Sequence, residues 1–302
     1  MKKAILIVSF GTTYPETRQK NIAAITRQVR ALYPDALVAE AVSSTIVRNA
    51  MKKREHIDAK SPEEGLLWLK EQGATHIVVF PTHVIDGIEN YRVKRVVEEY
   101  KTDFKQITVA DALLAKSCDY TNVAKALWES LKEKVGNAPL ILMGHGTEHT
   151  ADSSYAVMEQ ALQAYAQQPV YIATVEGKRT IADVIAQMQS EDIVNVRVVV
   201  APFMLVAGDH AHNDMAGMED SFASLLKENG YLPECILRGL GEYPAVREIY
   251  LSHLQKAAGT LFADITTKNR TGILYGIGVG SGNPKQMTLQ ALETIRACDL
   301  IV

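Results

Sequence analysis

Short apolar runs recur along the chain, and longer amphipathic stretches separate them. The runs are rich in Val, Ile and Leu and have the length of strands that are buried on both faces of a sheet. Eight of them predict strands, over Ala4–Phe10, Leu37–Ala41, His76–Phe80, Ile107–Ala110, Leu140–Met143, Val170–Thr174, Val196–Ala201 and Glu234–Leu237.

The amphipathic stretches carry apolar residues at helical spacing. They predict helices over Thr17–Tyr33, Pro62–Gln72, Asn90–Tyr100, Asn122–Val135, Ser154–Gln167 and Thr180–Ser190. Strands that alternate with helices indicate βαβ units, so we expect an α/β fold whose parallel sheets are flanked by helices. Ligands of such sheets bind beyond the carboxyl ends of the strands.

The pattern occurs twice. "ILIVSFGTT" and "HIVVFPTHVIDGIEN" in the first half correspond to "LILMGHGTE" and "VRVVVAPFMLVAGDHAHN" in the second. Each half has a strand ending in x-Gly-Thr, then a strand ending in Pro with a Gly six residues beyond it. Superposing the halves pairs Phe10 with His145 and Glu89 with His210. Chance is the alternative, since Gly and Pro commonly follow strands.

The repeat predicts an internal duplication in which two similar lobes face one another across a cleft. We expect an N-terminal lobe over residues 1–125 and a C-terminal lobe over 126–265 that carries the metal site. Residues 266–302 read as a strand, a Gly-rich turn, a helix and the start of another strand, which form a separate tail.

Composition narrows the class of protein. The chain has 302 residues, 47% of them hydrophobic and 22% charged, as in soluble enzymes. Its net charge of −3 argues against a nucleic-acid partner. It has no run of the ~20 apolar residues that a membrane span needs. Its three cysteines, Cys118, Cys235 and Cys298, lack CxxC spacing, so we expect a cytoplasmic protein without a disulfide framework.

His145 stands between two glycines where an apolar run ends. Glycine allows the backbone to turn sharply and a flat ligand to approach. His210 follows an apolar strand and Asp209, whose carboxylate is expected to orient the ring. The alternative interpretation is a loop histidine bonded to a neighbouring carbonyl for His145, and a local salt bridge for His210.

Glu176 lies just beyond another predicted strand, where a lone Glu more often caps a helix. Together with His145 and His210 it would complete two histidines and a carboxylate, a set that suits divalent first-row metals. The chain has no HExxH, GxSxG or P-loop motif, and "GIGVGSGNP" misses strict GxGxxG spacing. No organic cofactor is therefore expected.

Five segments, "SFGTT", "PTHVIDGIEN", "MGHGTEH", "TVEG" and "APFMLVAGDHAHNDM", carry a family resemblance. In this order they resemble the anaerobic sirohydrochlorin cobaltochelatases of the CbiK type, over about residues 1–260. The resemblance implies two chelatase-like α/β lobes around a cleft for the tetrapyrrole. It also implies insertion of Co²⁺ into sirohydrochlorin during anaerobic cobalamin biosynthesis.

The resemblance assigns roles to the residues already singled out. It implies that His145 is the proton acceptor and a metal ligand, and that Glu176 and His210 are the other metal ligands. It makes Glu89 a catalytic acid of the cleft that assists metal delivery. Three further residues are expected to contact the substrate, namely Phe10, His83 and Met204. Because the substrate carries several carboxylates, Arg48, Lys178 and Arg179 are candidates to bind them.

The tail sequence "YGIGVGSGNPKQMTLQALETIRACDLIV" resembles the opening of the precorrin-2/cobalt-factor II C20-methyltransferases. Ser281 stands where that family usually has Pro, and the rest of its domain is absent. The resemblance implies a fused partner enzyme of which this chain holds only the start, without methyltransferase activity.

Two alternatives to cobalt insertion remain. The same ligands accept Fe²⁺ or Ni²⁺, so the chain would then be an iron or nickel chelatase for sirohydrochlorin. A protein of another class, which binds haem or another tetrapyrrole without turnover, would use the same cleft. The sequence leaves metal selectivity and oligomeric state open.

Overall fold

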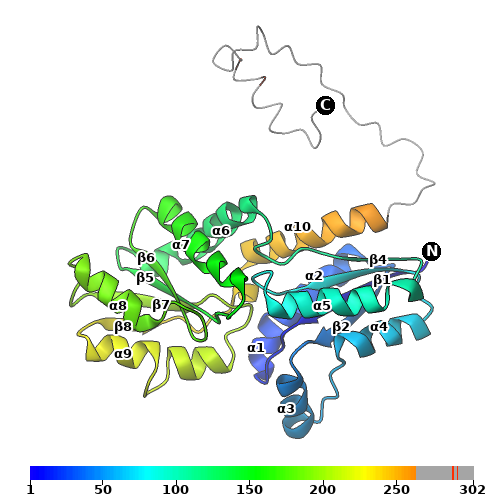
Figure 1. Ribbon diagram of the computed structural model, residues 1–302, viewed down its shortest axis with the longest axis horizontal. Helices are drawn as coiled ribbons and strands as arrows, with labels where there is room; N and C mark the ends of the chain where they lie inside the picture. The colour runs from blue at the N-terminus through cyan, green and yellow to red at the C-terminus, as the bar shows by residue number, and fades with distance from the viewer. Residues whose placement is uncertain (263–287, 289–290, 292–302) are drawn as a thin grey trace. The chain divides into compact units, whose positions relative to one another are not determined.

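A computed structural model describes residues 1–262 together with 288 and 291, and residues 1–262 form one compact unit. This unit contains two parallel sheets, each flanked by helices (Figure 1). The predicted fold class is therefore confirmed. The predicted tail lies outside the described residues, apart from 288 and 291.

The two sheets have the same topology. The first contains β1 (Lys3–Ser9), β2 (Leu37–Val42), β3 (His76–Pro81) and β4 (Gln106–Val109), in the order β2-β1-β3-β4. The second contains β5 (Leu140–Gly144), β6 (Val170–Thr174), β7 (Arg197–Pro202) and β8 (Leu232–Cys235), in the order β6-β5-β7-β8. In both sheets the first strand in sequence lies between the second and the third. All eight predicted strands are present within a few residues of their expected bounds.

Ten α-helices flank the sheets within the described residues. They are α1 (Pro15–Lys20), α2 (Ile22–Leu32), α3 (Thr45–Glu55), α4 (Pro62–Glu71), α5 (Ile88–Glu99), α6 (Ser117–Val135), α7 (Ser153–Ala166), α8 (Ile181–Ser190), α9 (Phe222–Glu228) and α10 (Pro244–Leu261). The expected lobe boundary at 125/126 falls inside α6, so one helix runs through it.

The helix expected over residues 17–33 is divided at Asn21. This residue is fully buried, and its φ of −106° and ψ of −73° depart from ideal helix values. Its amide donates to the Thr17 carbonyl (2.8 Å) and to Glu242 Oε1 (3.3 Å). A Cβ added at Gly241 would lie 2.9 Å from Asn21 Cβ. The break thus accommodates close packing against a turn from the other end of the chain, which local periodicity does not reveal.

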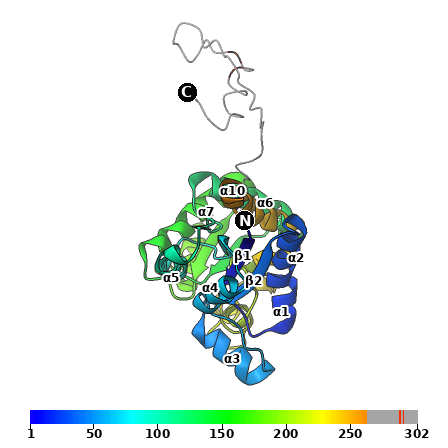
Figure 2. The same cartoon turned by 90° about the vertical axis from the view of Figure 1, so that its right-hand side faces the viewer.

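α10, the last helix within residues 1–262, packs against α6 and against β3 and β4 of the first sheet, although it follows the second sheet in sequence (Figures 1 and 2). The rings of Phe80 and Tyr250 meet edge to face with centroids 6.5 Å apart. The buried Tyr250 hydroxyl donates to the Thr82 carbonyl at 3.0 Å. The division into lobes at residue 125 stays a prediction, because the largest buried cluster includes residues from both halves.

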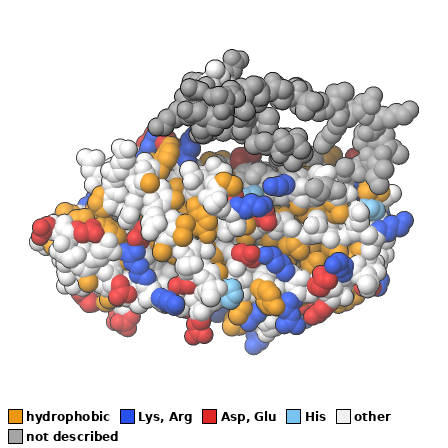
Figure 3. Space-filling view, turned by 45° about the horizontal axis from the view of Figure 1, so that its top comes forward, with side chains coloured by type: hydrophobic (Ala, Val, Ile, Leu, Met, Phe, Trp, Pro, Cys, Tyr) orange, Lys and Arg blue, Asp and Glu red, His pale blue; other side chains and the backbone are white. Residues whose placement is uncertain are grey.

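The surface is mixed in charge. In the face that Figure 3 shows, basic and acidic side chains are interspersed with apolar ones. In the part of the chain that the structure describes, no helix has both the length and the apolar character needed to cross a membrane.

Candidate functional site

The register of the sheets places the loops of the two halves at equivalent points. Val8 is the neighbour of Pro81 in the first sheet, and Met143 is the neighbour of Pro202 in the second. Phe10 and His145 each follow two residues after these positions. Their rings lie with centroids 6.2 Å apart, so the carboxyl ends of the first strands of the two sheets meet.

The glycines beside His145 serve local packing. Gly146 has φ +83°, and a Cβ there would lie 2.7 Å from Gly177 Cα and closer still to Gly177 N. A Cβ at Gly144 would overlap the ring of Tyr155. The Glu176 N–H donates to the His145 carbonyl at 2.8 Å. Two loops of the second half therefore pack backbone to backbone, which brings Glu176 beside His145.

The His145 side chain lies between the other two predicted ligands. Its Nδ1 is 3.8 Å from Glu176 Oε2, and its ring meets that of His210 at 90° with centroids 4.8 Å apart. Nδ1 also lies 3.0 Å from the Gly146 carbonyl oxygen, which only accepts hydrogen bonds. When Nδ1 donates this bond, Nε2 of the neutral ring is unprotonated and is free to accept a proton or bind a metal ion.

These contacts bring the three residues together without forming a preformed metal cage. Within residues 1–262, 288 and 291, no three His, Cys, Asp or Glu side chains are grouped as ligands of one ion. The side chains of Glu176 and His145 are 61% and 36% exposed. Exposed side chains change rotamer readily, so these three could still converge on one ion. Metal binding by this set stays a prediction.

The acid that orients His210 is Asp214, and the expectation for Asp209 was wrong. Asp214 Oδ2 lies 2.6 Å from His210 Nδ1, within one turn of the short helix Ala211–Met215. Asp209 instead accepts a hydrogen bond from the Tyr14 hydroxyl of the first half, at 3.4 Å. The i,i+4 spacing of His210 and Asp214 was the signal in the sequence, since such pairs are neighbours on a helix.

Glu89 lies in the first turn of α5, on the first-half side of the site. Its carboxylate accepts a hydrogen bond from Ser43 Oγ (3.2 Å) and also pairs with Arg92. Ser43 was not predicted from the sequence. It directly follows β2, so it belongs to the same sheet edge as Phe10, and this position was the available signal.

His83 extends this contact. Its Nε2 lies 3.5 Å from Ser43 Oγ, and its Nδ1 is buried and without a hydrogen-bond partner among the described residues. Burial lowers the pKa of His83 to about 4, so the ring is neutral at pH 7. A carboxylate only accepts, so the Ser43 hydroxyl donates to Glu89 and its oxygen is left to accept from His83 Nε2–H.

The remaining candidates differ in whether their side chains already have partners within the protein. Arg179 is held by Glu159 (2.6 Å) and Gln187 (2.6 Å), which makes it a structural residue of the second half. Lys178 is exposed. Met204 follows two residues after Pro202, as His83 follows Pro81, and it packs against the second buried cluster. Its contact with substrate stays a prediction.

Comparison with known proteins gives a consistent result. Residues 3–259 match the family described as cobalt chelatase (CbiK). The chain is 33% identical over 258 residues to the sirohydrochlorin cobaltochelatase of Salmonella typhimurium, an alignment that spans 85% of this chain and 97% of the relative. It is 32% identical over 267 residues to the sirohydrochlorin cobaltochelatase CbiKC of Nitratidesulfovibrio vulgaris, over 86% and 92% of the two chains.

Solved structures share the fold. SirB from Bacillus subtilis with Fe³⁺ superposes with a TM-score of 0.60 at 20% identity, over 86% of this chain and 97% of SirB. CbiX, the terminal enzyme for biosynthesis of siroheme in denitrifying bacteria, superposes with a TM-score of 0.51 at 17% identity, over 84% and 99% of the two chains. At these identities the likeness establishes the architecture alone.

Proposed function

The chain belongs to the cobalt chelatase (CbiK) family, and we propose that it inserts Co²⁺ into sirohydrochlorin during anaerobic cobalamin biosynthesis. Both curated relatives are named for this reaction and align over nearly their whole length. The observation that carries the proposal is the position of His145, in contact with His210 and beside Glu176 where the two sheets meet.

Metal insertion requires that water be stripped from the ion, that the macrocycle be presented to it, and that two pyrrole protons leave. His145, His210 and Glu176 would take the ion from water as temporary ligands. Such a site keeps open coordination positions, because it must pass the ion to the macrocycle, whereas a structural site is closed.

Once it has passed the ion on, His145 would accept one pyrrole proton at Nε2, and the second proton would leave to solvent water. The Gly146 carbonyl holds Nδ1–H, so the acceptor atom is defined before substrate arrives. The imidazolium that results would be stabilised by Glu176, 3.8 Å from Nδ1. A histidine is suited to this step, since its unperturbed pKa of about 6.5 lies near working pH.

Glu89 would act from the opposite lobe as the acid that assists metal delivery. Ser43 fixes one of its oxygens. Phe10, which is 38% exposed, would contact the flat macrocycle beside His145, and we assign His83 and Met204 to the same cleft. No organic cofactor is needed, because the reaction exchanges protons for a metal ion without a change of oxidation state.

Iron or nickel insertion is the nearest alternative, since the ligand types accept all three ions. A haem or tetrapyrrole carrier without turnover is the alternative of another class. A cytoplasmic location and a fused methyltransferase partner remain predictions. The names of the two curated relatives favour cobalt over the other metals.

The test is anaerobic mixing of metal-free sirohydrochlorin with Co²⁺ and a small molar fraction of protein. We expect the absorption spectrum of the cobalt product to develop over many turnovers, whereas a carrier would give only a shift stoichiometric with protein. Parallel reactions with Fe²⁺ and Ni²⁺, and mixtures of the ions, measure selectivity. His145→Ala should abolish turnover, by about 10²-fold or more, while sirohydrochlorin still binds.

A further inference from the structure

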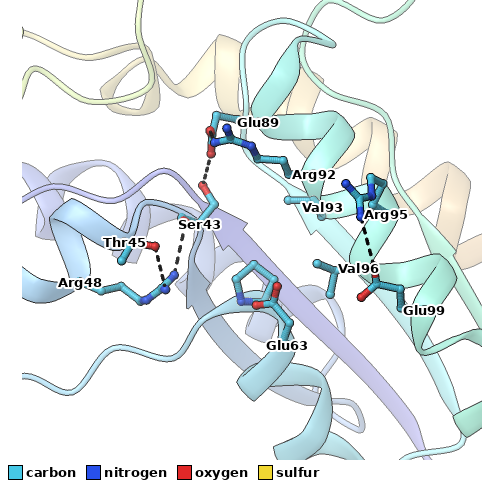
Figure 4. Close-up of a pocket in the computed structure, with 11 residues that line it drawn as sticks. Ser43, Thr45, Arg48, Glu63, Glu89, Arg92, Val93, Arg95, Val96 and Glu99 are labelled. Carbon is cyan, nitrogen blue, oxygen red and sulfur yellow. Dashed lines mark hydrogen bonds and ion pairs between the residues drawn. The ribbon is translucent and has the colours of Figure 1, made fainter.

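A charged cavity adjoins the candidate site on the first-half side. It has a volume of about 390 Å³ and lies between the start of α3, the start of α4 and the face of α5 (Figure 4). Two of its lining residues, Ser43 and Glu89, also belong to the candidate site. A molecule bound in the cleft can therefore extend a side chain into the cavity without leaving the site.

Three arginines line this cavity. Arg48 comes from α3 on one side, and Arg92 and Arg95 come from α5 on the other (Figure 4). Arg48 Nη1 donates to the carbonyls of Val42 (2.6 Å) and Ser43 (3.3 Å). These neutral partners fix the guanidinium, while no carboxylate among the described residues pairs with it.

Arg92 and Arg95 do have acidic partners, Glu89 and Glu99. Both arginine side chains are 64% exposed, and Arg95 Nη2 is 3.6 Å from Glu99 Oε1. Exposed pairs of this kind contribute only about 0–1 kcal/mol, so a ligand carboxylate can share or replace them. The cavity thus offers one fixed cation and two exchangeable ones.

A second cavity, of about 320 Å³, adjoins the same two arginines on α5. Its other lining residues are Ile88, Tyr91 and His149, and the Ile88 and Tyr91 side chains are 46% and 58% exposed. Arg92 and Arg95 therefore stand between a charged cavity and a largely apolar one. This arrangement suits a ligand that has an apolar body and carboxylates at its periphery.

The charges that line the cavity also disfavour a free polyanion as its ligand. Glu63 lines the charged cavity and would repel phosphate or another compact anion of high charge. A carboxylate on a flexible arm carries a single charge and is repelled less than such an anion. We propose that Arg48, assisted by Arg92 and Arg95, binds a carboxylate arm of the tetrapyrrole substrate. This assignment rests on the proposed function, which supplies the class of ligand.

The test is Arg48→Gln, titrated with metal-free sirohydrochlorin and followed by quenching of the tetrapyrrole fluorescence. Loss of a charge-assisted hydrogen bond should raise Kd by about tenfold or more. Arg48→Lys should fall between Arg48→Gln and wild type. Arg30→Gln, on an exposed position of α2 that lines neither cavity, should bind as wild type.

The methyl ester of sirohydrochlorin, which lacks the negative charges, identifies the interaction. Wild type and Arg48→Gln should bind the ester equally. An unchanged Kd for sirohydrochlorin in Arg48→Gln, or an equal loss of affinity for the acid and the ester, would overturn the assignment.

The titration contains no metal, so its result is independent of turnover. If binding of sirohydrochlorin depends on Arg48 but the protein inserts no metal, the proposed function is refuted and the role of Arg48 is retained. If the protein inserts metal but Arg48→Gln binds sirohydrochlorin as wild type does, the proposed function is retained and the role of Arg48 is refuted. If Arg48→Gln fails to fold, Arg92→Gln combined with Arg95→Gln carries the test at exposed positions. That double variant should raise Kd by about threefold or more, and an unchanged Kd would overturn the assignment.

Discussion

The rings of Phe10 and His145, which follow the first strand of each sheet, lie with centroids 6.2 Å apart and planes inclined at 54°. Equivalent register in the two sheets puts them at corresponding positions. The duplicated halves therefore meet at the same point of the fold, but one presents an apolar ring and the other a basic one. A planar macrocycle that reaches this point would meet an apolar ring and a proton acceptor side by side.

Gly146→Ala tests whether the glycines beside His145 place Glu176. At Gly146, φ is +83° and a Cβ would collide with the backbone of Gly177. Gly73 is a matched control, because its φ is +76° but a Cβ there would meet nothing within 4 Å. Each substitution should lower the free energy of unfolding by about 1 kcal/mol or more from backbone strain. Gly146→Ala should lower it further and also reduce turnover, as measured by urea unfolding and the cobalt assay. Equal losses of stability and wild-type turnover in both variants would contradict this account.

Ser43→Ala tests the position of Glu89. Without the Ser43 hydroxyl, Glu89 retains its pairing with Arg92 but loses the bond that directs one oxygen. We expect kcat to fall about tenfold with KM little changed, and Ser43→Thr to restore most of it. Ser130→Ala is the control, because it removes a hydroxyl that bonds within α6. If Ser43→Ala lowers only the free energy of unfolding and leaves kcat intact, Ser43 is a purely structural residue.

The strands and the duplicated arrangement follow from local sequence. Buried parallel strands are nearly continuous apolar runs, and the turn residues after them mark equivalent ends. The break at Asn21 does not follow, because it is set by a contact with Glu242, more than two hundred residues away in sequence. Packing of α10 against β3 is likewise a long-range choice that helical periodicity does not specify.

The site was predictable to the extent that strand ends meet at one edge. That reasoning identified His145, and the resemblance added the roles of its neighbours. It failed at the orienting acid, because adjacency in sequence suggested Asp209 whereas a helical turn brings Asp214 to the His210 ring. It also missed Ser43, since a serine after a strand is ordinary until Glu89 and His83 are seen beside it.

His83 should make the protein sensitive to acid. Its pKa is about 4 in the folded protein and near 6.5 when it is exposed on unfolding. Below pH 6.5 the unfolded chain therefore binds a proton that the folded protein does not, and stability falls until about pH 4 is reached. The loss is up to about 3 kcal/mol. Urea unfolding of wild type and His83→Gln at pH 7.5, 5.5 and 4.5 measures it. The wild type should lose more stability than the variant over this range, and parallel losses would show that His83 is not the group responsible.

Asp214→Ala tests whether the contact with His210 matters for metal binding. The carboxylate of Asp214 lies 2.6 Å from His210 Nδ1, so it holds that nitrogen as the donor and leaves Nε2 for the ion. Loss of such a partner typically weakens metal binding by about 10- to 100-fold, because the ligand loses both its orientation and part of its basicity.

Asp209→Ala is the matched control. It removes a neighbouring carboxylate whose contact is with Tyr14, at 3.4 Å, and should leave Co²⁺ affinity near that of the wild type. Calorimetric titration with Co²⁺ in the absence of sirohydrochlorin separates the two. If both variants bind Co²⁺ as the wild type does, His210 is not held for metal binding by Asp214. If only Asp209→Ala is impaired, the orienting role belongs to the residue that sequence adjacency first suggested.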